Sequence, residues 1–215
     1  MEKITLYHGS PNKEFTPTYG QGEDKHDYGR GFYLTEVLDL AKEWSVCKPV
    51  DTQGYVHTYE LELDNLKILD FENYDVLCWL AELMKHRDGD SSKRYQILSK
   101  KFIDKYGINT DEYDVIKGWR ADSSYFYIAK EFIRDNVDVS ILKDLLRLGD
   151  LGIQYCLKSE NAFSQLHELK DKLIVVNFEE FNSKYNERDT NTRNKMRELI
   201  NLDVNKIENV FSTLL

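Results

Sequence analysis

Three short motifs near the start of the chain combine residue types that can bind a flat, positively charged ring. They are Tyr7-His8-Gly9-Ser10, then Gly29-Arg30-Gly31-Phe32-Tyr33-Leu34-Thr35, and finally the single residue Trp44. The rings of Tyr33 and Trp44 can hold a cationic ring between them, because aromatic faces attract cations. A glycine such as Gly9 lets a ligand approach the backbone closely, so that its N–H and C=O can bind a carboxamide. Together the motifs predict a cleft for nicotinamide.

Cleavage of the bond between a nicotinamide and its ribose would need two further groups. The bond breaks through an oxocarbenium-like state, in which the ribose develops positive charge. His8 stands beside Gly9 and can hydrogen-bond the ribose, while a carboxylate from elsewhere would stabilise the charge. The Gly-x-Gly turns lack a third glycine that opens a helix, so they do not form a Rossmann fingerprint. The glycine pattern therefore does not predict a Rossmann-type dinucleotide site.

Apolar periodicity predicts the elements that must position these residues. We expect strands at residues 4–8, 31–35, 55–63, 67–71, 113–118, 154–158 and 173–176, and helices at 37–46, 74–86, 94–106, 124–134, 139–148 and 189–210. A further helix begins after Ser159 as its N-cap, and Gly149 is the expected C-cap of the helix before it. The stretch up to Gly31 reads as a long loop, and such loops in compact domains are usually functional or disordered.

The order of these elements predicts an α+β domain, with strands at both ends of the chain and helices inserted between them. A chain of 215 residues suits one domain and can bury a proper core. We expect a single domain over residues 1–215, with a helical insertion at about 74–110 and a helical extension at about 178–215.

Composition and charge exclude several classes of protein. With 41% apolar and 13% aromatic residues the chain is not disordered, and its net charge of −9 disfavours nonspecific binding to a phosphate backbone. The histidines outside the first motif lie on separate elements, so we expect no metal site. Three cysteines without a C-x-x-C pair predict buried thiols in a reducing compartment. The N-terminus lacks a signal-peptide pattern and no apolar run is long enough to span a membrane, so we expect a cytoplasmic protein.

The order and spacing of the motifs resemble the ADP-ribosyltransferase superfamily, in the branch shared by diphtheria toxin and the poly-ADP-ribose polymerases. That branch is marked by a His, Tyr, Glu triad, and His8 and Tyr33 match its first two positions. The polymerases place a second stacking aromatic eleven residues after the triad tyrosine, where this chain has Trp44. An amide-binding serine usually follows the tyrosine by eight residues, and here that position is Ala41. The resemblance implies a split β-sheet core with inserted and C-terminal helices.

The third triad position departs from the family pattern. In the polymerases the glutamate precedes a short strand late in the domain, and the corresponding stretch here offers Gln154. Glutamine can hydrogen-bond ribose hydroxyls but carries no charge. Either this residue has a role in the site, or it is a polar edge position and the carboxylate comes from Asp150 or Glu160.

A weaker resemblance extends over about residues 1–175. The blocks at 113–122 and 148–163 are similar to an uncharacterised bacterial family of transferase-like proteins, often discussed as toxins that are paired with small antitoxins. Arg120 and Asp122 follow a predicted strand and would line the mouth of the cleft. Arg30 is either solvated or reaches a phosphate of NAD.

The resemblance implies an NAD-dependent mono-ADP-ribosyltransferase that modifies an intracellular macromolecule, as a bacterial toxin or defence effector with a possible cognate antitoxin. His8, Tyr33 and Gln154 are its expected catalytic residues. NAD is expected as substrate, held by His8, Gly9, Ser10, Arg30, Tyr33 and Trp44. Two other functions stay open: an NAD glycohydrolase, and an inactive transferase fold that binds NAD or a nucleotide. The sequence does not decide whether the acceptor is a protein or a nucleic acid.

Overall fold

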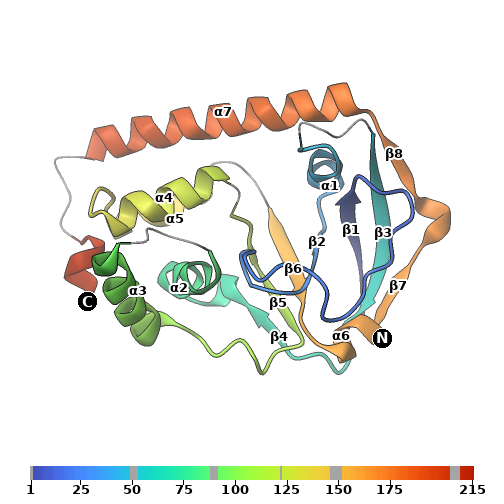
Figure 1. Cartoon of the computed structure of the whole chain (residues 1–215), viewed down its shortest axis with the longest axis horizontal. Coiled ribbons are helices and arrows are strands. Elements are labelled where there is room, and N and C mark those ends of the chain that lie inside the picture. The colour runs from blue at the N-terminus through green and yellow to red at the C-terminus, as the bar shows by residue number, and fades with distance from the viewer. Residues whose placement is uncertain (1, 49–52, 88–91, 122, 146–151, 204–208) are drawn as a thin grey trace.

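A mostly antiparallel sheet of eight strands forms one half of the molecule, and helices gather at its other half (Figure 1). The computed structural model describes residues 2–48, 53–87, 92–121, 123–145, 152–203 and 209–215. The predicted α+β class is confirmed. Gly149, Asp122 and Asp150, for which the sequence suggested roles, lie outside the described residues.

The strand order across the sheet is β4-β5-β6-β2-β1-β3-β7, and β8 also pairs with β3. The strands are β1 Lys3–Ser10, β2 Phe32–Thr35, β3 Gly54–Glu62, β4 Ile68–Asp70, β5 Val115–Trp119, β6 Ile153–Leu157, β7 Leu166–Glu168 and β8 Ile174–Val176. Only β4 and β5 pair in parallel among the described strands. The three-residue β7 was not predicted, because so short a strand has no readable alternation.

The sheet nearly divides between its two central strands. β1 pairs with β3 along its whole length, from Lys3 opposite Glu62 to Ser10 opposite Tyr55. On its other side β1 meets β2 at a single described residue pair, Tyr7 with Thr35. The strand also continues through Gly9 and Ser10, where the sequence predicted its end, because both residues pair with β3.

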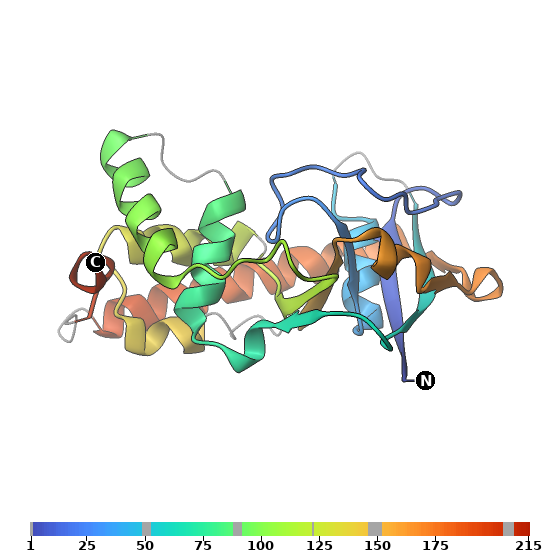
Figure 2. The same ribbon diagram turned by 90° about the horizontal axis from the view of Figure 1, so that it is seen from below.

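The α-helices are α1 Leu38–Ser45, α2 Val76–His86, α3 Lys93–Tyr106, α4 Ser123–Ile133, α5 Val139–Leu145, α6 Glu160–Ser164 and α7 Phe178–Asp203. Short 3-10 turns cover Phe71–Asn73, Lys170–Lys172 and Phe211–Leu214. Helices α2 to α5 lie together at the end of the molecule away from β1 and β3 (Figure 2). Ser159 caps α6 as predicted, since its hydroxyl accepts the N–H of Ala162 at 3.1 Å. Within the described residues, no helix is both long and apolar enough to cross a bilayer.

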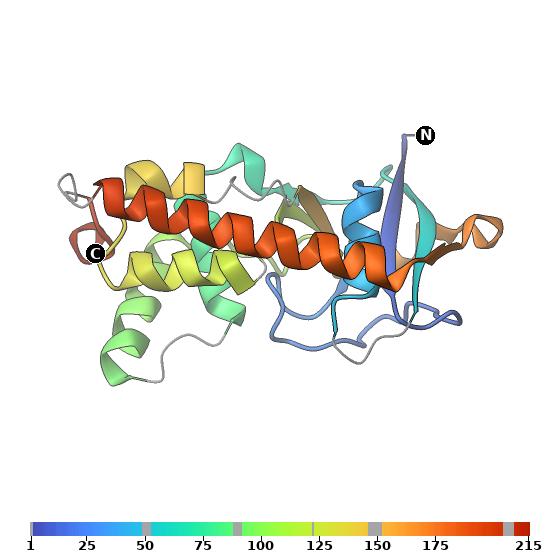
Figure 3. The same ribbon diagram turned by 90° about the horizontal axis from the view of Figure 1, so that it is seen from above.

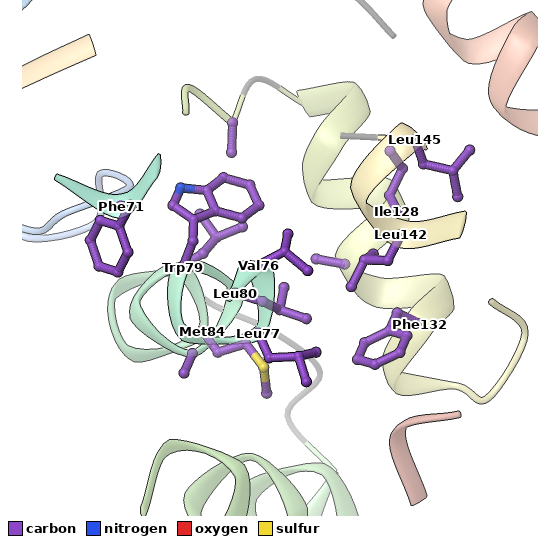
Figure 4. Packing of buried hydrophobic residues seen from close by; sticks show 14 of the residues in the cluster. Phe71, Val76, Leu77, Trp79, Leu80, Met84, Ile128, Phe132, Leu142 and Leu145 are labelled. Carbon is purple, nitrogen blue, oxygen red and sulfur yellow. The ribbon is translucent and has the colours of Figure 1, made fainter. Parts of the chain in front are cut away.

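The largest core cluster lies at the helical end, around α2 (Figure 4). Helix α2 is buried over almost its whole circumference, with Trp79, Leu80 and Leu83 fully covered. A helix that is apolar on every side belongs inside a core. The rigid position of α2 matters for the site, because the residue that caps its C-terminal end, Arg87, reaches the cavity described below.

Helix α7 begins at Phe178, eleven residues before the predicted start at Asp189. Its first turns are mostly polar, so the apolar periodicity there is weak. Phe178 and Phe181 nevertheless pack against α1, β3 and β8, in a cluster with Ala41, Val46, Val56 and Val176. Tertiary packing therefore extends the helix. It runs along the length of the molecule, over α1 at one end and over α4 at the other (Figure 3).

Candidate functional site

A cavity of about 510 Å³ opens beside the near-division of the sheet. Four residues singled out from the sequence line it together: His8 on β1, Tyr33 on β2, Trp44 on α1 and Gln154 on β6. The long loop between β1 and β2 forms another wall, and the remaining walls come from the ends of α2 and β5 and from α7. The structure thus brings together side chains from distant parts of the chain.

The imidazole of His8 has a fixed tautomer. Its Nδ1 lies 2.8 Å from the carbonyl oxygen of Tyr33 and must donate, because a carbonyl oxygen only accepts. The Nε2 atom is therefore a lone-pair acceptor, and no described residue hydrogen-bonds it. Burial lowers the pKa of His8 to about 4, so the ring is neutral at pH 7. Phe15 and Phe32 hold the ring, with centroids at 4.9 and 4.6 Å.

The hydroxyl group of Tyr33 is hydrogen-bonded to the backbone, and Tyr33 also lines the cavity. The hydroxyl donates to the carbonyl of Gly29 at 2.6 Å and accepts the N–H of Tyr28 at 3.0 Å. Burial raises the pKa of the phenol well above its usual value, so it stays protonated. The loop is in this way tied to β2. The ring of His26 packs edge-to-face with the ring of Tyr33, with 5.3 Å between the centroids, and His26 also lines the cavity.

One face of the Trp44 indole is covered by the protein itself. The guanidinium carbon of Arg120 lies 4.2 Å from the ring centroid, which is a cation–π contact. The indole N–H is buried, and no described residue accepts its hydrogen. A ligand ring that stacks on Trp44 would therefore use the other face or displace Arg120.

Gln154 is buried, with 3% of its surface exposed, and belongs to a hydrogen-bonded cluster with Asp27 and Trp119. Its side-chain amide donates to Asp27 Oδ2 at 2.8 Å and to the carbonyl of Trp119 at 3.3 Å. Asp27 also accepts the N–H of Ala121 at 2.8 Å and a two-pronged contact from Arg87, whose Nε lies 2.9 Å from Oδ1. The long loop thus places the buried carboxylate of Asp27 next to Gln154.

Asp27 and Arg87 were not predicted from the sequence. Asp27 is one of several charged residues in a loop without periodicity, and Arg87 follows Lys85 and His86 at the polar C-terminal end of a largely apolar helix. No local sequence pattern marks either residue as part of the site, because their ion pair joins positions that are far apart in the chain. The one hint was indirect: a predicted cleft whose third position carried no charge.

Three residues expected at the site do not line the cavity. At Gly9 an added Cβ would lie 2.0 Å from the carbonyl oxygen of Ala41 and 2.8 Å from the nitrogen of Ser45, so glycine here allows α1 to pack on β1. Ser10 is buried, and its hydroxyl accepts the N–H of Asn12 at 3.1 Å. Arg30 is exposed and pairs with Asp24 at 2.8 Å.

The alternative carboxylates differ in their positions. Glu160 is exposed at the first turn of α6 and does not line the cavity, while Asp150 lies outside the described residues. Across the part of the chain that the structure describes, no group of three or more His, Cys, Asp or Glu side chains is arranged to hold a metal ion.

The fold and the site define an α+β protein with a half-buried, aromatic-walled cavity at the centre of its sheet. A family described as "Protein of unknown function (DUF3990)" matches residues 4–168, so the chain belongs to this family. The match includes every cavity residue except Tyr185 of α7. No curated protein and no solved structure matches the chain.

Proposed function

We propose that this protein is an NAD-dependent mono-ADP-ribosyltransferase. The observation that carries the proposal is the meeting of His8, Tyr33, Trp44 and Gln154 in one cavity, although they come from four separate elements. The ADP-ribosyltransferase resemblance assigns these same four positions to the NAD site.

The chemical character of the cavity fits NAD. The ring of Tyr33 offers an aromatic face for nicotinamide, and His8 Nε2 offers an acceptor for a ribose hydroxyl. Arg87 and Arg120 supply positive charge for the pyrophosphate. The buried indole N–H of Trp44 is a donor that a ligand oxygen would satisfy.

In the proposed reaction the bond between ribose C1′ and the nicotinamide nitrogen breaks. Its electron pair stays on the nicotinamide, which leaves neutral. A nucleophilic atom of the acceptor forms the new bond to C1′ and gives up a proton. The cavity residues would bind and orient the substrate and exclude water from the reacting carbon.

We further propose that the protein acts in the cytoplasm on an intracellular protein or nucleic acid, as a toxin or defence effector restrained by an antitoxin. The resemblance to transferase-like bacterial toxins supports this role. Cys47, Cys78 and Cys156 form no disulfide in the described structure, which fits a reducing compartment.

One observation favours a second candidate, an inactive transferase fold that binds NAD. Gln154 is uncharged, and its amide group is committed to Asp27 and Trp119. If a charged carboxylate in direct contact with the ribose is indispensable, this cavity would bind NAD without turnover.

The test is incubation of the purified protein with labelled NAD and a cell lysate. We expect label on a macromolecule with the wild type and with His167→Ala, an exposed histidine away from the cavity. His8→Ala and the better-tolerated His8→Gln should lose at least about 90% of the labelling. Circular dichroism on each variant shows whether it is folded.

The other possible results of this assay distinguish the remaining candidate functions. Free ADP-ribose without a labelled macromolecule indicates a glycohydrolase, and NAD binding by calorimetry without any product indicates the inactive binding module. A wild-type protein that neither binds nor cleaves NAD overturns the proposal.

A further inference from the structure

We propose that Asp27 is a positioning residue that turns Gln154 into a pure hydrogen-bond acceptor, so that the two residues together replace a single carboxylate. The inference rests on the proposed NAD chemistry and deepens it. It gives the long loop between β1 and β2 a function, because this loop supplies the negative charge that the third triad position lacks. It also predicts that a glutamate placed at this position would impair the protein.

The Asp27 carboxylate is surrounded by hydrogen-bond donors from the protein itself. Its Oδ1 accepts two contacts from Arg87, and its Oδ2 accepts from Ala121 N and Gln154 Nε2, both at 2.8 Å. A carboxylate has about four lone-pair sites, and all four are in use. Asp27 therefore has no acceptor left for a ligand, although it lies on the cavity wall. Its effect on a ligand must pass through its partners.

Two neighbouring acceptors fix the orientation of the Gln154 side-chain amide. The side chain faces two acceptors, Asp27 Oδ2 at 2.8 Å and Trp119 O at 3.3 Å. Only the orientation that points the amide nitrogen at them forms hydrogen bonds, because the flipped amide would set three oxygens against one another. Both amide hydrogens are thus used. The carbonyl oxygen Oε1 has no hydrogen-bond donor among the described residues.

Toward a ligand, the oriented Gln154 amide resembles a glutamate carboxylate. An amide whose N–H groups are both bound presents a ligand with one oxygen that only accepts, as a glutamate oxygen does. The negative charge of Asp27 polarises this amide, and polarisation strengthens chains of buried hydrogen bonds. His8 Nε2 is also an acceptor without a hydrogen. The cavity therefore offers two acceptors that suit the hydroxyl groups of a ribose.

This arrangement predicts that Gln154→Glu harms the protein. A glutamate in the same rotamer would place a carboxylate oxygen where Nε2 now lies, at hydrogen-bond distance from Asp27 Oδ2. Two carboxylates so close cannot both be ionised without strong repulsion. The new side chain must take up a proton or turn away. In its protonated form it could donate to Asp27 as the amide does, and its second oxygen would again accept.

The experiment measures kcat and KM for nicotinamide release from NAD between pH 6 and 8. Five proteins are compared: wild type, Asp27→Asn, Gln154→Glu, the double variant with both changes, and Glu23→Gln as a control for an exposed charge in the same loop. Both single variants should lose kcat by about 10- to 100-fold, with a smaller change in KM. Glu23→Gln should keep wild-type values.

Two readouts separate positioning from a merely structural role. Relative to wild type, the kcat of Gln154→Glu should rise as the pH falls from 8 to 6, because protonation of Glu restores the donor to Asp27. The double variant again has one amide facing one carboxylate, and it should recover part of the lost kcat. Recovery will be partial, because the new amide group also faces the N–H of Ala121. A Gln154→Glu variant as active as wild type at pH 8 overturns the inference.

Thermal unfolding without NAD makes this result distinguishable from failure of the proposed function. The pair predicts that the two single changes are not additive in melting temperature, and that Gln154→Glu is stabilised relative to wild type as the pH falls. If wild type does not cleave NAD but this coupling is present, the proposed function fails and the paired geometry stands. If NAD is cleaved and the coupling and pH effects are absent, the inference alone fails.

Discussion

At the scale of single residues, the site shows how burial and one hydrogen bond decide what a side chain can offer. An exposed histidine exchanges its ring hydrogen and titrates near pH 6.5. His8 differs, because its Nδ1–H donates to the Tyr33 carbonyl and burial lowers its pKa to about 4. It is therefore suited to accept a hydroxyl hydrogen and unsuited to donate a proton. Gln154 is restricted in a comparable way by its two acceptors.

The lowered pKa of His8 predicts a dependence of stability on pH. Above pH 6.5 the ring is neutral in both the folded and the unfolded chain, so it contributes no pH dependence there. As the pH falls toward about 4, the unfolded chain takes up a proton that the folded protein refuses, and stability is lost. The full effect is on the order of 3 kcal/mol.

The measurement is urea unfolding of wild type and His8→Gln at pH 7, 5.5 and 4.5. The variant cannot titrate at this position, so its unfolding free energy should fall less steeply than that of wild type. Other acidic and histidine side chains change both proteins alike. Identical slopes for the two proteins would contradict the lowered pKa.

At the scale of elements, α7 is the part of the cavity wall that lies outside the family match. Its first half is attached to α1 by the contact of Arg188 with the buried Glu43 at 2.8 Å. Asn182 also donates to the carbonyl of Val46 at 2.9 Å. These contacts hold Tyr185 at the cavity. Members of the family that end differently would therefore have a different wall here.

We expect Tyr185→Ala to weaken NAD binding by about tenfold, which corresponds to about 1.4 kcal/mol, because it removes an aromatic wall from the cavity. The melting temperature should change little, since Tyr185 is only half-buried. Calorimetric titration with NAD measures the affinity. Glu187→Ala, an exposed neighbour on the same helix, is the control. Equal affinities for the two variants would remove α7 from the site.

At the scale of the whole molecule, the cavity lies where the sheet is weakest. The two halves of the sheet meet at one described pair between β1 and β2. Other contacts supplement this junction: the long loop joins α2 through Asp27 and Arg87, and α7 spans α1 and α4. A ligand in the cavity would touch both halves at once.

Ligand binding should therefore stabilise the molecule as a unit. NAD at about one hundred times its dissociation constant should raise the unfolding free energy by about 2.7 kcal/mol. Hydrogen exchange should slow most in residues 15–33 and in the first half of α7, which lie on different walls of the cavity. Helix α3 contributes no residue to the cavity, so its exchange should slow only as far as the higher global stability requires, which makes it the internal reference. Slowing at α3 without slowing at the loop would place the ligand elsewhere.

Much of the fold and part of the site follow from local sequence patterns. The strands around His8, Tyr33 and Gln154 and the helix that carries Trp44 occur within one or two residues of their predicted positions. These predictions succeed because alternation and helical periodicity record which face of an element is buried, and that record lies within a few neighbouring residues.

Only the tertiary structure decided which of the expected residues reach the cavity and what accompanies them. Gly9 is required by the packing of α1, a contact with residues far along the chain that no local pattern reveals. A helical extension was expected from about residue 178, but the helix pattern itself only from Asp189, and the packing of Phe178 and Phe181 sets the start of α7. Asp27 and Arg87 became site residues through an ion pair between a loop and a helix end.

The sequence alone, through its resemblance to the ADP-ribosyltransferases, predicts that a histidine, two aromatic residues and an uncharged glutamine belong to one nicotinamide-type site. It did not determine where the missing charge would be found. A carboxylate affects its surroundings through space and not along the chain, so its partner is set by how the loop folds back. In this protein the fold places Asp27 against Gln154, a contact between residues far apart in the sequence that only the tertiary structure reveals.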